Sequence, residues 1–522
     1  MSYSVVWFKR DLRVHDHTAL FHAARSRPVL CLYVIESSLW AASDASRQHY
    51  QFLIESLRDL YAQLRQKGGR LWVVTGDVDA VLERLHSLAP FAALYSHEET
   101  GNGLTYQRDL AVARWCRQHD IPWHEFAQFG VTRRLKSRDD WKGLWDAHVK
   151  SPQFDLSADQ PLMWTTLPWH EPAIPTALEL GLNQADVPLR QKGGRKAGLA
   201  VLNSFLTTRS GHYRGGISSP LSAPTACSRI SPFLALGCLS LREVVQATRQ
   251  QMVNLPDAAS RHKQGLVAFI SRLYWHCHFI QKLESEPALE YQNVHRGYDG
   301  LREGDWNPAH FDALVAGRTG WPLVDACVAM LRETGWINFR MRAMLVSVAA
   351  YPLWLHWRPV GLWLAQQFLD YEPGIHWSQM QMQSGTTGIN TTRIYNPIKQ
   401  AMDHDPNGDF VRHWLPAMRR VPDAWLFEPW RMPPDLQEKY GVRVGLDIPL
   451  PLVDLQTATR EAKQRMYALR AQPTVQAGKA AIVEKHASRK MPGAAKSRRK
   501  TRNPEGQDAS RQFSTAQLGL DF

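Results

Sequence analysis

The sequence predicts a Rossmann-like α/β domain followed by an all-α domain. Residues 3–130 alternate β-rich runs with amphipathic helical stretches, which is the rhythm of a parallel sheet flanked by helices. From about residue 200 to 430, apolar residues recur at helical spacing and strand patterns nearly disappear. A chain of 522 residues is also too long for one compact core, so two domains are the natural division.

The predicted elements follow the chain in order. Strands are expected at VVWF, PVLCLYVI, RLWVVTG and ALYSH, because these runs are rich in β-branched and aromatic residues. Helices are expected at 49–67, 105–119 and 455–471, where the apolar spacing is helical. The predicted boundaries are 1–130 for the α/β domain, 131–200 for a linker rich in Pro, Trp and charge, 201–455 for the helical domain and 456–522 for a basic, disordered tail.

The chain carries an excess of positive charge. Its 62 Lys and Arg outnumber 49 Asp and Glu, for a net charge of +13. Such an excess usually indicates an anionic partner, most often nucleic acid. About half of it lies in residues 471–522, which hold ten Lys and Arg against four Asp and Glu. The folded body is therefore only mildly basic.

The cysteine pattern and the hydropathy indicate where the protein works and whether it holds a metal. The six cysteines include no CxxC pair and no Cys/His cluster at zinc spacing, so we expect reduced thiols and no metal site. The first strand pattern begins at Val5 and is followed at once by charged residues, which leaves no room for a signal peptide. No apolar run reaches the roughly 18 residues of a membrane helix. We expect a soluble, cytoplasmic monomer.

Four motifs carry a resemblance to a known family. They are VVWFKRDLRVHDHTAL at 5–20, CSRISPFLALGCLSLREV at 227–244, GRTGWPLVDACVAMLRETGWINFRMRAM at 317–344 and RIYNPIKQ at 393–400. In this order they resemble the photolyase/cryptochrome family, and the chain looks like a divergent bacterial, photolyase-like flavoprotein. The resemblance implies an N-terminal antenna domain, a long linker and a helical domain that holds FAD in a U shape.

The segment CSRISP reads as a helix start, with Ser228 or Ser231 as the N-cap. Hydroxyls and free N–H groups at a helix start suit a diphosphate, because the dipole and the donors both point at the anion. By resemblance, Cys227, Ser228, Arg229 and Ser231 hold the FAD pyrophosphate, with Tyr213 also at the phosphates. Cys227 stands where relatives carry Thr, so one hydroxyl donor is lost.

The flavin ring is assigned by counting from the motifs. The resemblance places an ion pair on Arg342 and Asp370 and the residue against flavin N5 on His376. An arginine beside the ring would stabilise the negative charge of reduced flavin. Relatives carry Asn, Asp or Cys in place of His376, and we expect the imidazole to set which flavin radical is stable. The resemblance adds Glu372, Phe269, His276 and Phe339 to the cofactor-binding set.

The stretch HWSQMQMQ at 376–383 departs from the family pattern. Photolyases carry two tryptophans there, one the flavin-proximal member of an electron-carrying chain and the other a wall of the lesion pocket. Here the two positions fall on Met380 and Met382. Methionine is a poorer hole carrier than indole, so we expect the chain to be interrupted at its first step. By resemblance the electron-transfer set is Trp306, Trp357 and Met380, and Trp377 would substitute for Met380 if its side chain faces the ring.

The lesion pocket is also altered. Trp275 matches the second stacking tryptophan of the family, but Arg272 stands where repair enzymes place a Glu and His276 replaces an Arg. Because arginine only donates hydrogen bonds, the recognised base edge must present acceptors. Enzymes that repair (6-4) lesions use a His pair where this chain has Asn338 and Phe339. The catalytic set implied by the resemblance is Trp275, Arg272, His376 and Met382.

Two further segments point to DNA work. We expect Arg340, Lys399 and Gln400 to contact the DNA backbone beside Trp275. The last residues resemble the short peptides with which bacterial DNA-processing proteins dock on the β sliding clamp, and an extended peptide on a basic tether suits a groove. A frayed terminus is the alternative. The residues of this peptide are Gln517, Leu518, Leu520 and Phe522.

The resemblance implies an FAD-dependent, blue-light-driven DNA photolyase, in which an electron passes from photoexcited reduced flavin to a pyrimidine lesion in UV-damaged DNA. The substituted pocket favours an alternative, a cryptochrome-like blue-light photoreceptor without repair activity. A third reading is an ordinary redox flavoprotein that works in the dark. A second antenna chromophore, folate or deazaflavin, is expected near SHEETGNGLTYQRD at 96–109, and its identity stays open.

Overall fold

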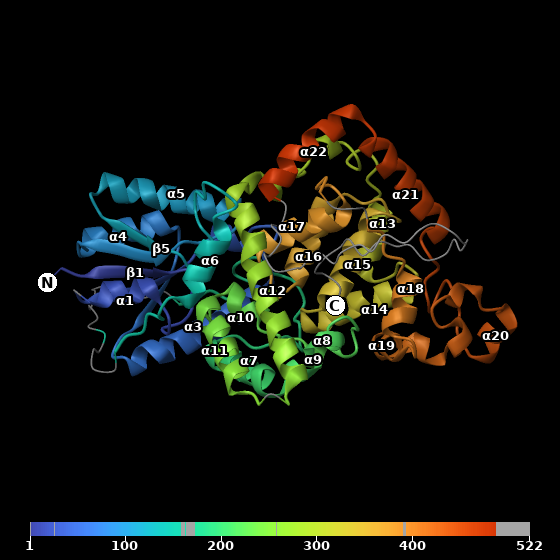
Figure 1. The fold of residues 1–522 in the computed structure, drawn as a ribbon, viewed down its shortest axis with the longest axis horizontal. Helices are drawn as coiled ribbons and strands as arrows, with labels where there is room; N and C mark the ends of the chain where they lie inside the picture. The colour runs from blue at the N-terminus through green and yellow to red at the C-terminus, as the bar shows by residue number, and fades with distance from the viewer. Residues whose placement is uncertain are drawn as a thin grey trace, which may run out of the picture.

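The N-terminal domain is a five-stranded parallel sheet with helices on both faces (Figure 1). The computed structural model of the protein describes residues 2–25, 27–157, 162, 173–256, 258–389 and 393–486. The strand order β3-β2-β1-β4-β5 places β1 at the centre, where all five of its residues are buried, as expected for a parallel sheet covered twice. The strands are β1 Ser4–Phe8, β2 Val29–Ile35, β3 Leu71–Thr75, β4 Ala93–His97 and β5 Trp123–Phe126.

The helices of this domain other than the short α2 bury residues on one face. In the longest one, α3, Leu53, Leu57, Leu60 and Leu64 recur at helical spacing and are all buried. The helices are α1 Thr18–Ala24, α2 Ser37–Trp40, α3 Arg47–Gln66, α4 Val78–Leu88 and α5 Gly103–Gln118.

The expected linker contains two helices. They are α6 Trp141–Lys150 and α7 Arg195–Ser204. The Trp141 and Trp145 rings lie 4.9 and 5.2 Å from the ring of Tyr274, so α6 packs against the helical domain. Trp141 and Trp145, which made this segment look irregular in the sequence, are therefore packing residues.

The second domain is built of helices, and its described residues contain no sheet (Figure 1). The 26-residue helix α12 runs along the domain and contacts both α8 and α17. Gly265 permits the α8 contact, since a Cβ there would lie 1.9 Å from the Ser210 carbonyl oxygen. The helices up to α14 are α8 Ser210–Gly216, α9 Ala223–Ala226, α10 Ser231–Ala235, α11 Leu241–Asn254, α12 Ser260–Ser285, α13 Pro308–Ala316 and α14 Pro322–Thr334.

The remaining helices complete the domain and its C-terminal extension. No helix among the described residues combines the length and the apolar character that a bilayer crossing demands. A π-helical turn, Phe205–Arg209, joins α7 to α8, and short 3₁₀ helices lie at Pro287–Glu290, Arg296–Tyr298, Pro416–Arg420, Asp423–Trp425 and Pro429–Arg431. The α-helices are α15 Phe339–Ala350, α16 Trp357–Gln367, α17 Pro373–Ser384, α18 Pro397–His404, α19 Asp409–Trp414, α20 Pro434–Lys439, α21 Leu455–Arg470 and α22 Pro473–His486.

Two sequence motifs meet where the domains join. The amide of Leu12 donates to the Leu236 carbonyl at 3.1 Å, and the Arg13 guanidinium donates to the Gly237 carbonyl at 3.0 Å. Gly237 has φ +63°, and a Cβ there would lie 2.2 Å from the carbonyl oxygen of Arg10. Only glycine therefore allows this approach, which ties the first motif of the chain to the helical domain.

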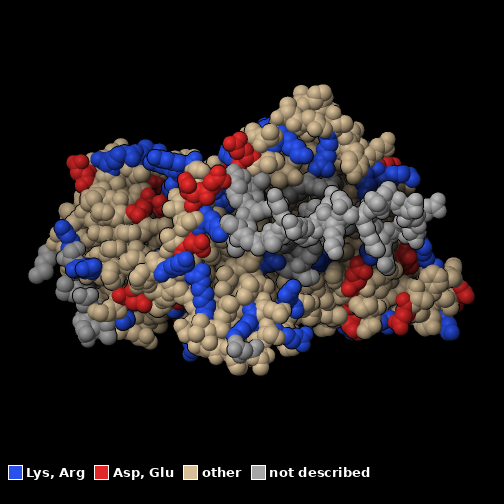
Figure 2. Space-filling view, viewed as in Figure 1, with Lys and Arg blue, Asp and Glu red and all other residues tan. Residues whose placement is uncertain are grey.

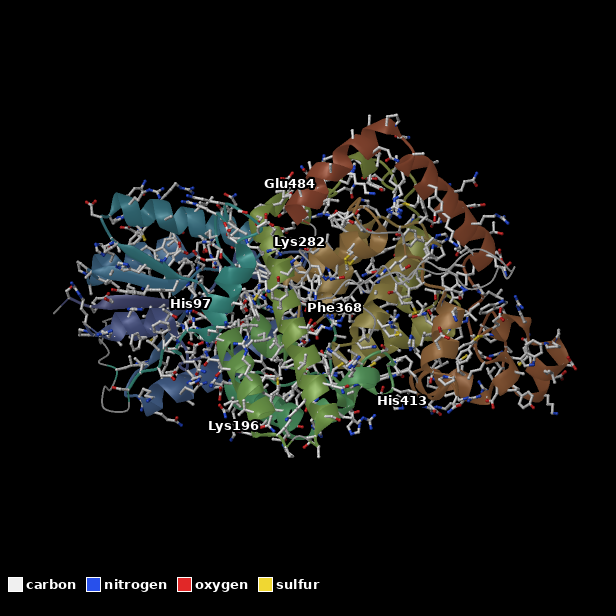
Figure 3. The ribbon with its side chains drawn as sticks, in the orientation of Figure 1. His97, Lys196, Lys282, Phe368, His413 and Glu484 are labelled. Carbon is white, nitrogen blue, oxygen red and sulfur yellow. The ribbon has the colours of Figure 1, made fainter. Side chains whose placement is uncertain are left out.

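Helix α22 occupies part of the range in which disorder was expected. Val475 is buried beside Tyr298 and Tyr351, and the His295 ring donates to the Val475 carbonyl at 2.8 Å. At the other end, His486 lies 2.5 Å from Glu286, next to the end of α12 (Figure 3, where Glu484 and Lys282 mark the two helices). A basic composition concealed these few anchoring contacts, so the expected disorder began too early.

Candidate functional site

A cavity with apolar walls and several charged groups lies inside the helical domain and has a volume of about 320 Å³. Phe368, labelled in Figure 3, belongs to its wall. The walls of the cavity come from α8, the α9–α10 connection, α12, α15 and α17. Many of the residues predicted from the sequence line it: Tyr213, Cys227, Ser228, Arg229, Ser231, Arg272, Trp275, His276, Phe339, Arg342, Asp370, Glu372, His376 and Met380.

One end of this cavity is cationic and rich in hydrogen-bond donors. Arg229 takes φ +62°, and its guanidinium lies 3.8 Å above the Trp336 ring. Burial lowers the pKa of Arg229 to about 10, so a bound anion would stabilise its charge. Ser228 and Ser231 flank this arginine in the cavity lining. This end suits the diphosphate of the expected cofactor.

The expected helix cap at this segment is wrong. Helix α10 begins at Ser231 and its N-cap is Ile230, with no capping hydrogen bond from a side chain. The four residues from Cys227 to Ile230 instead connect two short helices. The Ser228 hydroxyl is consequently not engaged in capping α10.

Arg342 and Asp370 form the predicted ion pair. The guanidinium meets the carboxylate in two places, at 2.9 and 3.0 Å, and also donates to the Ile337 carbonyl at 2.9 Å. Although burial favours the protonated acid, the charge of Arg342 lowers the pKa of Asp370. Arg342 also lies 4.1 Å above the Phe368 ring, which fixes the plane of the guanidinium.

The cavity lining carries more positive than negative charge. Its arginines are Arg229, Arg272 and Arg342, while its carboxylates are Asp370 and Glu372. The apolar remainder of the lining offers flat surface to a ring system. These residues fit an anionic cofactor that bears an aromatic ring.

Glu372 links this cavity to the N-terminal domain. Its carboxylate accepts a hydrogen bond from Arg10 at 2.8 Å, so a residue of the first motif holds a residue of the cavity wall in place. Burial raises the pKa of Glu372 to about 7, against the opposing effect of Arg10. The acid can therefore change its protonation state near neutral pH.

His376 is neutral in this structure. Its Nε2 lies 2.9 Å from the Gly361 carbonyl, and because a carbonyl only accepts, Nε2 carries the proton. Burial lowers the pKa of His376 to about 4. The remaining nitrogen, Nδ1, is therefore unprotonated and can accept a hydrogen bond from a ligand but cannot donate one.

Helix α17 presents one face to the cavity. Ile375, His376, Gln379, Met380 and Gln383 line it, which is the i, i+1, i+4, i+5, i+8 pattern of a helix face. Met382 lies outside this set, and so does Trp377. The resemblance placed Met382 in the wall of the lesion pocket, whereas the helix presents Gln379 and Gln383 to the cavity.

Trp377 lies one layer behind the cavity wall. It is fully buried, with its ring centroid 4.9 Å from that of His376 and 5.9 Å from that of Trp357. Trp357 is anchored by its indole N–H, which donates to Asn293 at 2.8 Å. Trp306 packs on Phe311, with ring centroids 5.1 Å apart. Of the residues predicted to carry electrons, Trp357 and Trp377 are therefore in contact with each other.

The other predicted residues take varied positions around the cavity. Trp275 packs on Phe279 at 5.7 Å and on His278 at 4.8 Å, and Arg272 interacts with the Tyr213 phenol. Phe269 is buried behind Tyr213 and does not line the cavity. Asn338 donates to the carbonyls of Ile217 and Ser218, at 3.0 and 2.8 Å. Arg340, Lys399 and Gln400 lie outside the lining, and Lys399 is ion-paired with Asp403 at 3.3 Å.

A second cavity, of about 170 Å³, lies at the carboxyl ends of β1 and β4. The strand order reverses between these two strands, which is where open parallel sheets bind ligands. Arg108 stands in its wall and forms ion pairs with Glu36, Glu99 and Asp109 at 3.0, 2.6 and 2.8 Å. Tyr371 lines both cavities, so the two share a wall.

One group of described residues has metal-like spacing, Asp11, His17 and His97, all fully buried. His17 Nδ1 accepts from the Leu20 amide at 3.0 Å, so its Nε2 carries the proton and faces Asp11 at 3.0 Å. His97 Nδ1 lies 2.7 Å from the same carboxylate oxygen. Both rings therefore serve to hold a buried carboxylate at the start of the first loop.

The predicted site residues and the residues of the main cavity do not coincide fully. The clamp-like peptide, Gln517 to Phe522, lies outside the described residues. Conversely, sequence reasoning missed Tyr371, Gln379 and Gln383 in the main cavity. Helical spacing from His376 could have found the two glutamines, whereas Tyr371 gave no signal beyond its place between two acids.

Comparisons with known proteins agree with this geometry. The family model described as DNA photolyase matches residues 4–132, and the one described as FAD binding domain of DNA photolyase matches residues 269–468. A cryptochrome DASH of Gloeobacter violaceus is 31% identical over 86% of this chain and 93% of its own length. A deoxyribodipyrimidine photo-lyase of Alkalihalophilus pseudofirmus is 26% identical over 90% of this chain and 97% of its own.

Solved structures share the fold. A Synechocystis cryptochrome superimposes with a TM-score of 0.79 at 23% identity, over 89% of this chain and 99% of that one. A class III photolyase from Agrobacterium tumefaciens gives 0.76 at 24%, over 90% and 98%. The predicted fold class is confirmed, and the domain around the main cavity is an FAD-binding domain. The chain belongs to the photolyase/cryptochrome family.

Proposed function

We propose that this protein is a blue-light-driven DNA photolyase that acts on UV-induced pyrimidine lesions. The observation that carries the proposal is that one cavity combines the cationic, hydroxyl-rich end with Trp275 on its wall. A cofactor and a flipped-out base would then lie in contact. When bound, reduced FAD supplies a light-driven electron that splits the lesion and then returns.

The cationic end holds the cofactor in this account. Arg229, Ser228 and Ser231 receive the diphosphate, and the Arg342–Asp370 pair fixes the ring. The neutral His376 accepts a hydrogen bond through Nδ1. Glu372, whose burial raises its pKa to about 7, holds or releases a proton beside the cofactor near neutral pH.

The base enters beside Trp275. Its ring supplies a stacking surface, which is worth about 1–3 kcal/mol per base. Gln379 and Gln383 offer both donors and acceptors to the base edge. On the face drawn in Figure 2, Lys and Arg predominate over the segment from α7 to α8, which includes Arg209 in the π-helical turn and Arg214 in α8. Arg340, Lys399 and Gln400 are proposed to contact the backbone of the DNA.

Repair of a defined lesion tests the proposal. FAD-loaded protein, reduced chemically, is illuminated with oligonucleotides that carry a cyclobutane dimer or a (6-4) product, and restored pyrimidines are measured. We expect repair of one lesion in blue light and none in the dark. Trp275→Ala should lower it at least tenfold, whereas Trp430→Phe, far from the cavity, should not change it. Absence of repair of both lesions would refute the proposal.

A blue-light photoreceptor without repair activity is the second candidate. Arg272 favours it, because this cavity arginine interacts with the Tyr213 phenol and stands where a repair enzyme would read the base with a carboxylate. A relative that covers most of the chain is named cryptochrome DASH. Under this reading, light changes the redox state of the cofactor and alters partner binding, and the repair assay gives no product.

We also propose a second chromophore in the smaller cavity. Its position at the reversal of strand order and its shared wall with the main cavity favour efficient energy transfer between the two. Folate and deazaflavin remain the two options.

The peptide at Gln517–Phe522 is proposed to dock on the β sliding clamp, and equal retention on immobilised clamp by the full chain and by a chain ending at Ala516 would refute this.

A further inference from the structure

The two tyrosines of the main cavity differ in what their phenols contact. Tyr213 interacts with the guanidinium of Arg272, which only donates, so the phenol oxygen is the acceptor. Tyr371 does the reverse, because its hydroxyl donates to Asp44 Oδ2 at 2.8 Å. Tyr371 is thus the cavity tyrosine whose proton already points at a base.

Asp44 is well placed to take that proton. It belongs to the N-terminal domain, is 8% exposed, and accepts a second hydrogen bond from the Asn102 side chain at 2.9 Å. Among the described residues, Asp44 forms these hydrogen bonds and no ion pair with Lys or Arg. Because the phenol O–H already points at this carboxylate, the proton of an oxidised phenol has a direct path to it.

Tyr371 is also in contact with the aromatic groups of the flavin-binding cavity. Its ring centroid lies 5.2 Å from that of His376, at 81°. On its other side the ring stacks with His49 at 6.2 Å. The side chain of Trp377 interacts with the same phenol. The phenol therefore connects the cofactor cavity with the second cavity, which Tyr371, Asp44 and His49 also line.

We propose that Tyr371 is the electron donor for light-driven reduction of the bound cofactor, and that Asp44 is the acceptor of its proton. One electron leaves the phenol for the light-excited, oxidised flavin, and the O–H bond breaks as the proton moves to the Asp44 carboxylate. The products on the protein side are a neutral tyrosyl radical and a protonated Asp44. This inference rests on FAD in the main cavity and on no step of DNA repair.

Two other residues near the cavity, Met380 and Trp377, are less suited to donate the electron than Tyr371. Met380 stands at the wall where relatives have a tryptophan, and its thioether carries no proton that could leave with the electron. Trp377 lies outside the lining, although it touches both His376 and Tyr371. A phenol becomes a strong acid when it loses one electron. A hydrogen-bonded carboxylate that takes the proton therefore makes the phenol easier to oxidise.

The resting state is restored by an external thiolate. It gives one electron to the tyrosyl radical and leaves as a thiyl radical, while Asp44 returns the proton to the phenolate. Electrons and protons balance, and the net reaction transfers one electron from the thiolate to the cofactor.

Photoreduction of the FAD-bound protein tests the pair. Oxidised protein is illuminated with blue light in the presence of dithiothreitol, and the loss of oxidised-flavin absorbance is followed. We expect Tyr371→Phe to slow it at least tenfold and Asp44→Asn at least threefold, with loss of the solvent deuterium isotope effect in the latter. Tyr106→Phe, on the exposed surface of α5, is the matched control and should keep the wild-type rate.

Radical identity provides a second readout that needs no variant. Protein made with ring-deuterated tyrosine is illuminated and frozen, and its electron paramagnetic resonance spectrum should narrow. Narrowing with deuterated tryptophan instead, or a Tyr371→Phe rate within twofold of wild type, would overturn the proposal. Repair by chemically reduced protein bypasses this step, so a failure of the repair assay is distinguishable from a failure here.

Discussion

Arg342 is the residue whose role is easiest to isolate. Its two-point contact with Asp370 compensates a buried carboxylate, and Arg342→Gln leaves that charge without its partner. We expect the variant to lose about 3 kcal/mol in free energy of unfolding. Urea denaturation of the FAD-bound protein measures the loss.

A control separates this effect from general damage. Arg318→Gln changes the same residue type at an exposed position and should alter the free energy of unfolding by less than about 0.5 kcal/mol. Asp370→Asn removes the charge that needs compensation, so it should cost less than Arg342→Gln. Equal losses for the two cavity variants would contradict a charge-based role.

At this scale the sequence located residues but could not supply their partners. Counting from motifs placed Arg342, Asp370 and His376 in the cavity, because motif spacing fixes a position along a helix. It could not foresee that His376 donates to the Gly361 carbonyl, since that partner lies on a different helix. Phe269 was assigned to the cofactor set but lies behind Tyr213, because a helix period predicts a face and not the depth of a side chain.

Helix α17 is the element that sets the electron route. Met380 faces the cavity, so a tryptophan there would stand beside the cofactor and could pass a hole to Trp377 and Trp357. We expect Met380→Trp to restore photoreduction in the Tyr371→Phe background to at least half the wild-type rate. The measurement is the decay of oxidised-flavin absorbance in blue light. No rescue would mean that the route through Trp377 is closed.

The ends of β1 and β4 carry an acid-sensitive contact. Burial lowers the pKa of His97 to about 3, so between pH 6.5 and 3 the unfolded chain binds a proton that the folded chain does not. The stabilisation is complete above pH 6.5 and is lost as the pH falls. His97→Asn can still donate to Asp11 and cannot titrate.

The expected result is a shallower acid limb for His97→Asn. The free energy of unfolding should fall less steeply between pH 6.5 and 4.5, by up to about 1.4 kcal/mol per pH unit. Urea denaturation at several pH values measures both slopes. Parallel slopes for the two proteins would show that His97 does not titrate in this range in the unfolded chain either.

For whole elements, prediction succeeded where periodicity is strong. Strands β1 to β4 and helix α3 followed from runs of β-branched residues and from leucines at helical spacing, whereas β5, Trp123–Phe126, was not predicted. Helix α22 did not follow, because its anchors are single contacts such as that of His295 with the Val475 carbonyl. Such contacts join segments far apart in the sequence and leave no local pattern.

At the scale of the molecule, the two domains act as one unit around the cofactor. Arg10 reaches from the N-terminal domain to Glu372, and Asp44 reaches to Tyr371. The sequence predicted both domains and their order. It could not predict these contacts between domains, because tertiary partners are not encoded by spacing within either motif. Through them the N-terminal domain holds Tyr371 and Glu372, two residues of the main cavity's wall, from behind.

The central claim is that a damaged base and the cofactor share one cavity. Its most direct test is a dark titration of oxidised, FAD-bound protein with a UV-damaged oligonucleotide and with the same undamaged sequence, followed by flavin absorption. The account predicts that damaged DNA shifts the flavin bands in the wild-type protein, that undamaged DNA does not, and that Trp275→Ala removes the shift. Identical spectra with the two oligonucleotides would contradict it.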